Sequence, residues 1–172
     1  MDIHETALRY ITHRMRTKDE IRKNLIGKGF TAEEADEEIE KLVEIGCVND
    51  KAYAKAYIEY AFEKGKAFVR ARQELKTRGI DSETADEAYE EWQAEKEEQE
   101  EEGPQRVSAD EKQRAYIQAL KCLGILGGGE SGTAPVTEEK LLAKASRRLA
   151  SLGYGSDVIY SVIGRLKSGT EE

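Results

Sequence analysis

Apolar residues recur along this chain at intervals of three and four, and one such pattern is written three times around a glycine. An apolar residue stands four positions before each glycine, and another follows it directly. The three copies are Leu25–Gly29–Phe30, Leu75–Gly79–Ile80 and Leu149–Gly153–Tyr154. Glycine takes the left-handed conformation just past a helix end, where flanking apolar residues can meet. We therefore predict three helix–turn–helix corners.

Each corner runs without a gap into an apolar stripe. Its positions are Ala35, Ile39 and Leu42; Ala85, Tyr89 and Trp92; and Ile159, Ile163 and Leu166. Spacings of four and then three place these residues on one face of a helix. We expect Thr31 and Asp81 to cap the first two of these helices, whereas Gly155 offers the weakest cap.

A further apolar pattern precedes each corner and predicts a helix there. It comprises Ala7, Leu8, Tyr10 and Ile11; Tyr53, Ala54, Tyr57 and Ile58; and Ala115, Tyr116, Ala119 and Leu120. A three-helix unit buries little surface alone, so stacked neighbours should share a core. We predict an all-α protein of three tandem three-helix modules in an elongated, right-handed helical array. A plain helical bundle with coincidental similarity is the alternative.

The expected modules are residues 1–48, 49–102 with an acidic extension, and 108–168 with a Gly-rich insertion. Gly65 should separate the first two helices of the second module. Residues 124–135 read as a flexible loop, and residues 168–172 as a loose end. The remaining helix caps are expected at Thr17, at Asn49 or Asp50, and at Thr137.

The composition suits a soluble helical protein, with 36% charged and 7% aromatic residues. No stretch is apolar enough to span a membrane. The N-terminus lacks the basic and apolar segments of a secretory signal, so we expect a cytoplasmic protein. Cys47 and Cys122 are far apart and read as small buried residues in a reducing compartment.

The net charge of −8 hides a strong asymmetry. Residues 83–102 hold eleven acidic residues and one lysine. Their local net charge of −10 is larger in magnitude than the −8 of the whole chain. Basic residues crowd the second helix of each module and indicate a surface that meets something negative. A solvated face, or pairing with neighbouring acids, is the alternative. The candidate contact residues are Arg22, Lys23, Lys28, Lys66, Arg70, Arg72, Lys76, Arg78, Arg147 and Arg148.

The sequence offers no active site that we can identify. The glycine cluster at 124–132 lacks the Gly-Lys-Ser/Thr ending of a phosphate loop. His4 and His13 have no metal-ligand spacing, and we expect them at the surface. No carboxylate stands isolated in an apolar setting. We therefore expect no enzyme activity, no metal and no cofactor.

One segment is more distinctive than the rest. Residues 45–58 read Ile-Gly-Cys-Val-Asn-Asp-Lys-Ala-Tyr-Ala-Lys-Ala-Tyr-Ile. The likeness continues in order at residues 7–11, 20–25, 28–30, 64–66, 72–75, 78–80, 148–154 and 158–159. Together they resemble the RecX family, bacterial regulators of the recombinase RecA. The Gly-rich insertion and the long acidic segment depart from the family pattern.

The resemblance implies a non-enzymatic regulator that binds RecA and its nucleoprotein filament. Such a protein restrains the ATPase, coprotease and strand-exchange activities of RecA in recombination, DNA repair and the SOS response. A monomer with weak direct contact to nucleic acid would fit this role. A stand-alone helix–turn–helix DNA-binding module and a generic helical scaffold are the alternatives.

Overall fold

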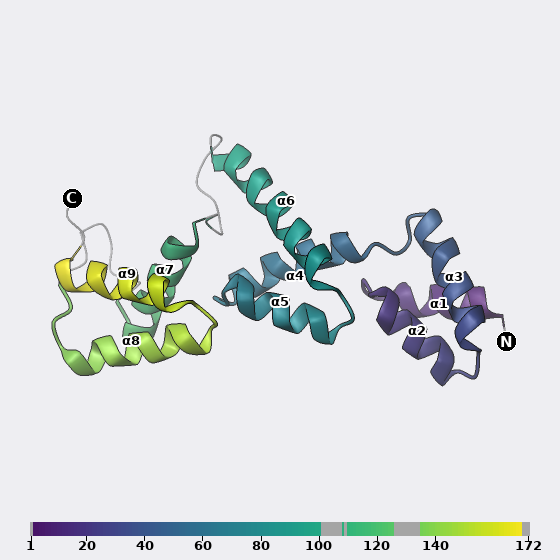
Figure 1. Cartoon of the computed structure of the whole chain (residues 1–172), viewed down its shortest axis with the longest axis horizontal. Helices are drawn as coiled ribbons and strands as arrows, with labels where there is room; N and C mark the ends of the chain where they lie inside the picture. Colours follow the sequence, from purple (N-terminus) through teal and green to yellow (C-terminus); the bar gives the residue numbers. More distant parts are fainter. Residues whose placement is uncertain (1, 101–107, 109, 126–134, 170–172) are drawn as a thin grey trace. The chain divides into compact units, whose positions relative to one another are not determined.

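The structure is a computed structural model that describes residues 2–100, 108, 110–125 and 135–169 (Figure 1). Within these residues the chain forms nine α-helices and no strand. The helices are α1 Ile3–Ile11, α2 Lys18–Gly27, α3 Ala32–Glu44, α4 Asp50–Glu63, α5 Phe68–Thr77, α6 Ser82–Glu100, α7 Glu111–Leu123, α8 Glu139–Ser151 and α9 Ser156–Ser168. The predicted all-α class and the tandem helix triplets are confirmed. The predicted loop at 124–135 lies mostly outside the described residues, as do the final residues 170–172.

The three predicted corners are present, each with its glycine in the left-handed region. Gly29, Gly79 and Gly153 have φ values of 99°, 82° and 91°. The amide that follows each glycine donates back to the leucine carbonyl at the helix end, over 3.2 Å in every copy. This hydrogen bond closes the turn and brings the two apolar residues together. The same local chemistry therefore forms all three corners.

Most of the predicted caps are confirmed. Thr17 and Thr31 each form a reciprocal capping box with the glutamate three positions on. Asn49 Oδ1 accepts from the Ala52 amide over 3.0 Å at the start of α4. The prediction for Thr137 was wrong, because α8 begins one residue later at an N-cap that makes no side-chain hydrogen bond.

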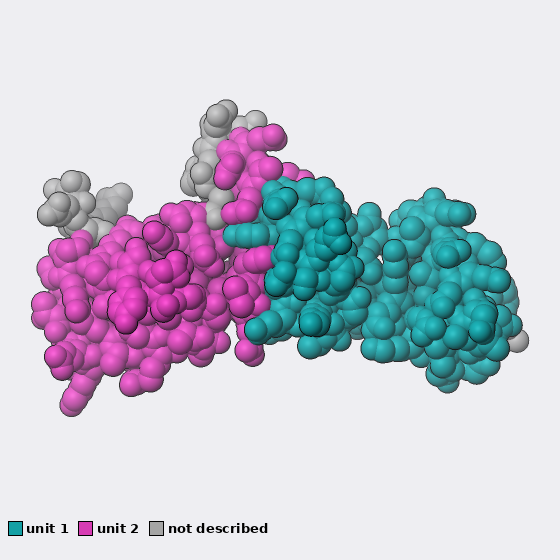
Figure 2. Space-filling view, in the orientation of Figure 1, with its two compact units in different colours: residues 1–58, 72–92 teal, residues 59–71, 93–172 magenta. Residues whose placement is uncertain are grey.

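The chain divides into two compact units (Figure 2). Unit 1 comprises residues 1–58 and 72–92, and unit 2 comprises residues 59–71 and 93–172. Helices α4, α5 and α6 contribute residues to both units. The residues of the middle helix triplet are thus divided between the two units.

The core of the first triplet in unit 1 contains one residue that the sequence pattern missed. The apolar part of this core consists of Ala7, Ile21, Leu25, Ala35, Ile39, Leu42 and Val48. Glu38 lies among them with 2% of its surface exposed. Its carboxylate lies 2.6 Å from His4 Nδ1 and 3.9 Å from Lys41 Nζ. The expectation that no carboxylate stands in an apolar setting was therefore wrong, but these two partners give Glu38 a structural role.

The core of unit 2 is built from α7, α8 and α9, and it shifts the predicted stripe of α9. The fully buried residues of this helix are Val158, Val162 and Leu166. Ile159 and Ile163, which were expected there, are only partly buried at the edge of the core. The stripe therefore begins one position earlier than the gap-free alignment predicts. The residue nine positions after the corner glycine is buried in all three copies; it is Glu38, Ala88 or Val162.

The cysteines do not share the environment that was predicted for them. Cys47 is exposed in the turn between α3 and α4, and Cys122 near the end of α7 is half-buried. The Cys47 amide donates to the Leu42 carbonyl over 2.9 Å, so the backbone of this residue closes the end of α3 while its thiol faces outward.

Each unit contains a junction between neighbouring triplets, and the two junctions use equivalent positions. In unit 1, Thr17 Oγ1 at the start of α2 donates to the Arg78 carbonyl at the α5 corner over 2.8 Å. In unit 2, the Ala67 amide at the start of α5 donates to the Leu152 carbonyl at the α8 corner, also over 2.8 Å. Thr17 and Ala67 precede their own corner glycines by the same number of residues. A corner therefore also receives the start of the second helix of the preceding triplet.

Candidate interaction surfaces

Two of the predicted contact residues form matching ion pairs inside unit 1. Arg22 Nε donates to Asp36 over 2.6 Å, and its Nη2 donates to the second carboxylate oxygen over 3.2 Å. Arg72 Nη2 donates to Asp86 over 2.7 Å. These hydrogen bonds raise the pKa of both arginines, and the bond from Arg22 lowers the pKa of Asp36. Pairing with the following acidic helix, the alternative that the sequence left open, thus describes Arg22 and Arg72.

Two further candidates are also engaged within unit 1. Lys23 Nζ lies 2.6 Å from Asp19 one turn earlier on α2. Arg78 Nη1 donates to the Tyr53 hydroxyl over 3.0 Å, and its guanidinium carbon lies 4.8 Å from the centre of the Tyr57 ring. Arg78 is therefore committed to contacts within its own triplet.

The remaining candidates lie at or near the surface. Lys66 is half-buried and Arg70 is exposed, at the start of α5 in unit 2. The others are exposed and make no ion pair with the described part of the chain; they are Lys28, Lys76, Arg147 and Arg148. Charge is thus available to a partner mainly at these last four positions.

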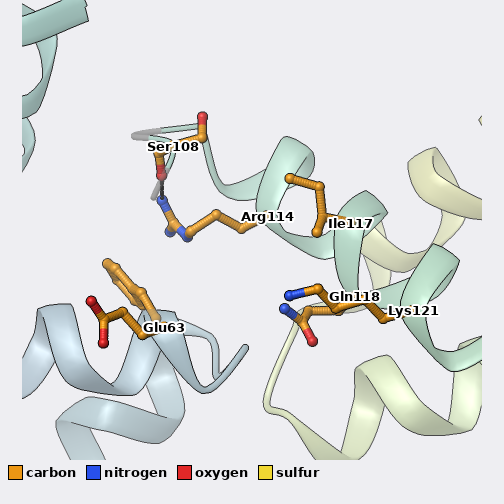
Figure 3. A pocket seen from close by; sticks show the side chains of 7 residues that line it. Glu63, Ser108, Arg114, Ile117, Gln118 and Lys121 are labelled. Carbon is orange, nitrogen blue, oxygen red and sulfur yellow. Dashed lines mark hydrogen bonds between the residues drawn. The ribbon is translucent and has the colours of Figure 1, made fainter. Parts of the chain in front are cut away.

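Unit 2 contains a cavity of about 290 Å³ where the end of α4 meets α7. Figure 3 shows Arg114 reaching across it to Ser108, with Gln118 and Lys121 on the same helix. Arg114 is 4% exposed; its Nη1 donates to the Ser108 carbonyl over 2.8 Å, and its Cζ lies 4.0 Å from the centre of the Phe62 ring. These contacts hold α4 and α7 together and give Arg114 a structural role that sequence reasoning missed.

Unit 1 contains a larger acidic groove of about 710 Å³, between α2, α3 and the α5–α6 corner. Lys18 and Arg22 are its basic lining residues. Its carboxylates are Asp19, Asp36, Glu40, Glu44, Asp50 and Asp81. Burial raises the pKa of Asp50, whose carboxylate accepts the Lys18 amide over 2.9 Å. This excess of carboxylates along α3 would repel a phosphate backbone.

A second pocket of unit 1, about 320 Å³ in volume, has the opposite charge and lies between α1 and α2. We call it the cationic pocket; its lining includes Arg9, Tyr10, His13, Arg16, Asn24 and Lys28. Of these, the sequence analysis singled out only Lys28 as a contact residue. The others lie on α1, on α2 and in the loop between them, so clustering along the chain did not reveal that they share a pocket.

Within the described ranges, no group of His, Cys, Asp or Glu side chains could hold a metal ion. No helix in the part of the chain that the structure describes is long and apolar enough to cross a membrane.

Comparison with known proteins decides the family. Models of the first and second three-helix domains of RecX match residues 4–42 and 49–88. The regulatory protein RecX of Trichlorobacter lovleyi is 34% identical over 160 residues, which cover 92% of this chain and 91% of the relative. The chain belongs to the RecX family. The regulatory protein RecX of Amycolatopsis mediterranei is 32% identical over 151 residues, covering 87% of this chain and 74% of that one.

The fold of the RecX family is also seen in solved structures. RecX from Lactobacillus salivarius superposes with a TM-score of 0.72 at 20% identity, covering 95% of this chain and 94% of that chain. A second RecX structure gives a TM-score of 0.69 at 22% identity, covering 93% of this chain and 70% of the other. These likenesses establish the RecX fold for the chain, including its third helix triplet.

Proposed function

We propose that this protein regulates the recombinase RecA by binding RecA or its nucleoprotein filament. The observation that carries the proposal is the likeness to a regulatory protein RecX along nearly the whole of both chains. Such a regulator restrains ATP hydrolysis, coprotease activity and strand exchange by interfering with filament growth or persistence. It performs no chemistry itself, and it acts as a monomer in the bacterial cytoplasm, where the filament forms.

The helix triplets fit this role as three modules, residues 1–48, 49–102 and 108–168. Exposed cations lie on or beside the second helix of each module, at Lys28, Lys76 and Arg147. Several modest contacts on one chain add through effective concentration, so each module can bind weakly while the whole binds well. The ion-paired Arg22 and Arg72 then serve to hold their corners rather than to meet the partner.

The alternative of a stand-alone helix–turn–helix DNA-binding module is disfavoured by the charge of α3. The third helix of a triplet would take the recognition position, where side chains approach the major groove. On α3, however, Glu40 and Glu44 line the acidic groove, and Asp36 already neutralises Arg22. Weak contact between other surfaces of the protein and nucleic acid remains part of the proposal.

The test is RecA's hydrolysis of ATP in the presence of single-stranded DNA, with this protein titrated in below the RecA concentration. The proposal predicts inhibition at substoichiometric ratios, because one bound copy affects many subunits of a filament. Unchanged hydrolysis at an excess of protein would reject it. Tight DNA binding without RecA, with a steep salt dependence, would instead favour the DNA-binding alternative.

A matched pair of variants locates the contact in unit 2. Arg147→Glu with Arg148→Glu should weaken inhibition about tenfold, since two exposed cations of α8 become repulsive. Lys112→Glu with Lys140→Glu makes the same change of net charge at exposed lysines of the same unit and should have little effect. Equal behaviour of the two double variants would remove Arg147 and Arg148 from the contact.

A further inference from the structure

The cationic pocket of unit 1 holds positive charge with little internal compensation. None of its described lining residues is acidic. Arg9 is paired with Glu5 over 2.7 Å, but Lys28 is exposed and makes no ion pair with a described residue. Arg16 Nε is buried without a hydrogen-bond partner in the described part of the chain. Arg16 and Lys28 both line the pocket without an ion pair to a described residue, so both positive charges can act on an anion that enters it.

The pocket also presents a stacked aromatic–arginine pair. The Arg16 guanidinium carbon lies 4.1 Å from the centre of the Tyr10 ring. Aromatic rings and arginine planes are the surfaces on which unstacked nucleobases rest in proteins that bind single strands. The Asn24 side chain, which also lines the pocket, can both donate and accept hydrogen bonds. Cations beside a stacking surface favour a nucleic acid over a plain carboxylate ligand.

In the second triplet, side chains of the protein itself occupy the place that corresponds to the cationic pocket. Tyr57 is the eighth residue of α4, as Tyr10 is of α1, and its hydroxyl donates to Glu74 over 2.6 Å. Glu74 stands five residues before its corner glycine, as Asn24 does in the first triplet. The residue just before the glycine, Arg78, lies over the Tyr57 ring. Lys28 at the equivalent position in the first triplet has no such partner among the described residues.

We propose that the cationic pocket binds single-stranded nucleic acid, with a phosphate between Arg16 and Lys28 and a base against the Arg16–Tyr10 stack. The inference deepens the proposed function by naming where this protein meets the single strand of a filament. In the second triplet, Glu74 and Arg78 already contact the equivalent tyrosine, Tyr57. We therefore expect the nucleic-acid site in the first triplet and not in the second.

The repeat itself supplies the decisive variant, Asn24→Glu, which places the second triplet's carboxylate in the first. Because Glu74 already occupies this position in a folded triplet, the variant should fold. Asn24→Gln is the matched control, because a glutamine side chain has the length of glutamate but carries no charge. The probe is a fluorescein-labelled oligothymidylate of about 12 nucleotides, followed by anisotropy at low salt without RecA. Circular dichroism checks that both variants keep their helicity.

Wild type and Asn24→Gln should bind alike, and Asn24→Glu should bind about tenfold more weakly, because a carboxylate replaces a neutral group beside the phosphate. Lys28→Ala should also reduce the slope of log affinity against log salt by about 0.7, the value for one lost phosphate contact on a single strand. Lys140→Ala removes an exposed lysine of unit 2 that belongs to no proposed contact, and it should leave that slope unchanged.

Equal binding by the Asn24→Glu and Asn24→Gln variants would overturn the proposal. Displacement of the oligonucleotide by polyglutamate at equal charge concentration would also overturn it, because the pocket would then be a site for acidic protein segments. If Asn24→Glu fails to fold, the salt slopes of Lys28→Ala and Lys140→Ala decide alone. Since RecA is absent, loss of oligonucleotide binding is measured separately from inhibition of RecA, and the proposed function can stand if this site does not.

Discussion

The corners at Gly29 and Gly79 have the same sequence pattern and the same backbone turn, yet only the corner at Gly79 is covered by residues of another helix triplet. A Cβ atom at Gly79 would lie 2.2 Å from Asp19 Cβ, whereas a Cβ atom at Gly29 would meet nothing within 4 Å. Gly153 is covered like Gly79, because a Cβ atom there would lie 2.9 Å from Arg70 Cβ. A glycine that ends a helix can thus also allow the preceding triplet to approach closely.

The difference explains how a short helix triplet becomes part of a larger protein. At Gly79 and Gly153 the backbone carbonyl just before the glycine accepts a hydrogen bond from the preceding triplet. At Gly29 a Cβ atom would meet nothing within 4 Å, so among the described residues this corner only closes its own turn. Substitutions at equivalent positions can therefore separate the energy of the turn from the energy of the junction.

The largest effect is expected from Gly79→Ala compared with Gly29→Ala. Both place a side chain in the left-handed region, which costs about 1 kcal/mol. Gly79→Ala also forces the start of α2 away from the corner, so the total loss of stability should be about 3 kcal/mol. Urea unfolding followed by circular dichroism measures both. Equal losses of stability would show that the junction contributes nothing.

Thr17→Ala compared with Thr31→Ala should give the next largest effect. Each threonine caps its helix through a capping box, and losing such a cap costs about 1 kcal/mol. Thr17 is fully buried and also donates to the Arg78 carbonyl, so its loss should cost about 2 kcal/mol. The same urea experiment compares the two variants, and a smaller loss for Thr17→Ala than for Thr31→Ala would contradict the junction.

Tyr154→Phe tests the covered corner of unit 2 and should cost about 1 kcal/mol. The Tyr154 hydroxyl donates to the Gly65 carbonyl over 3.1 Å. Burial raises its pKa from 10.0 to about 12. The folded state therefore favours the neutral phenol; its contribution to stability is complete below pH 10 and is lost as the pH rises toward 12. Wild type should lose more stability than Tyr154→Phe over that interval, measured by urea unfolding at each pH.

The smallest effect should come from Arg22→Ala at the open corner. The hydrogen bond from Arg22 lowers the pKa of Asp36 from 3.8, so its contribution is present above that pH and lost as the pH falls below it. Both side chains are exposed to solvent, which screens the pair. Thermal unfolding at neutral and acidic pH should show the difference between wild type and variant shrinking in acid. A constant difference would exclude the ion pair as its cause.

The sequence predicted what short-range chemistry determines. The corner glycines, the caps at Thr17, Thr31 and Asp81 and the helix triplets all follow from residues a few positions apart. The junctions could not be predicted in this way, because Thr17 and Arg78 are 61 residues apart. The burial of Glu38 was missed because its partner His4 lies on another helix, and a helical stripe alone predicts an apolar residue at that position.

The candidate interaction surface was predicted less well for the same reason. Clustering along the chain found basic helices but not the acids that face them. A signal was nevertheless present, because Arg22 with Asp36 and Arg72 with Asp86 repeat the same separation in two copies of the corner. The third copy has Ser146 and Tyr160 at these positions and cannot form the pair. The cationic pocket combines α1, α2 and the loop between them, so its one-signed lining appears only in the folded triplet.

The most direct test of the central claim is the amount of RecA retained on single-stranded DNA over time, measured with labelled RecA after this protein is added at less than one copy per RecA subunit. A regulator that acts on the filament predicts a progressive loss of RecA from the DNA, and the loss should weaken in the Arg147→Glu, Arg148→Glu variant. Retention identical to that of RecA alone, at any concentration of this protein, would contradict the account.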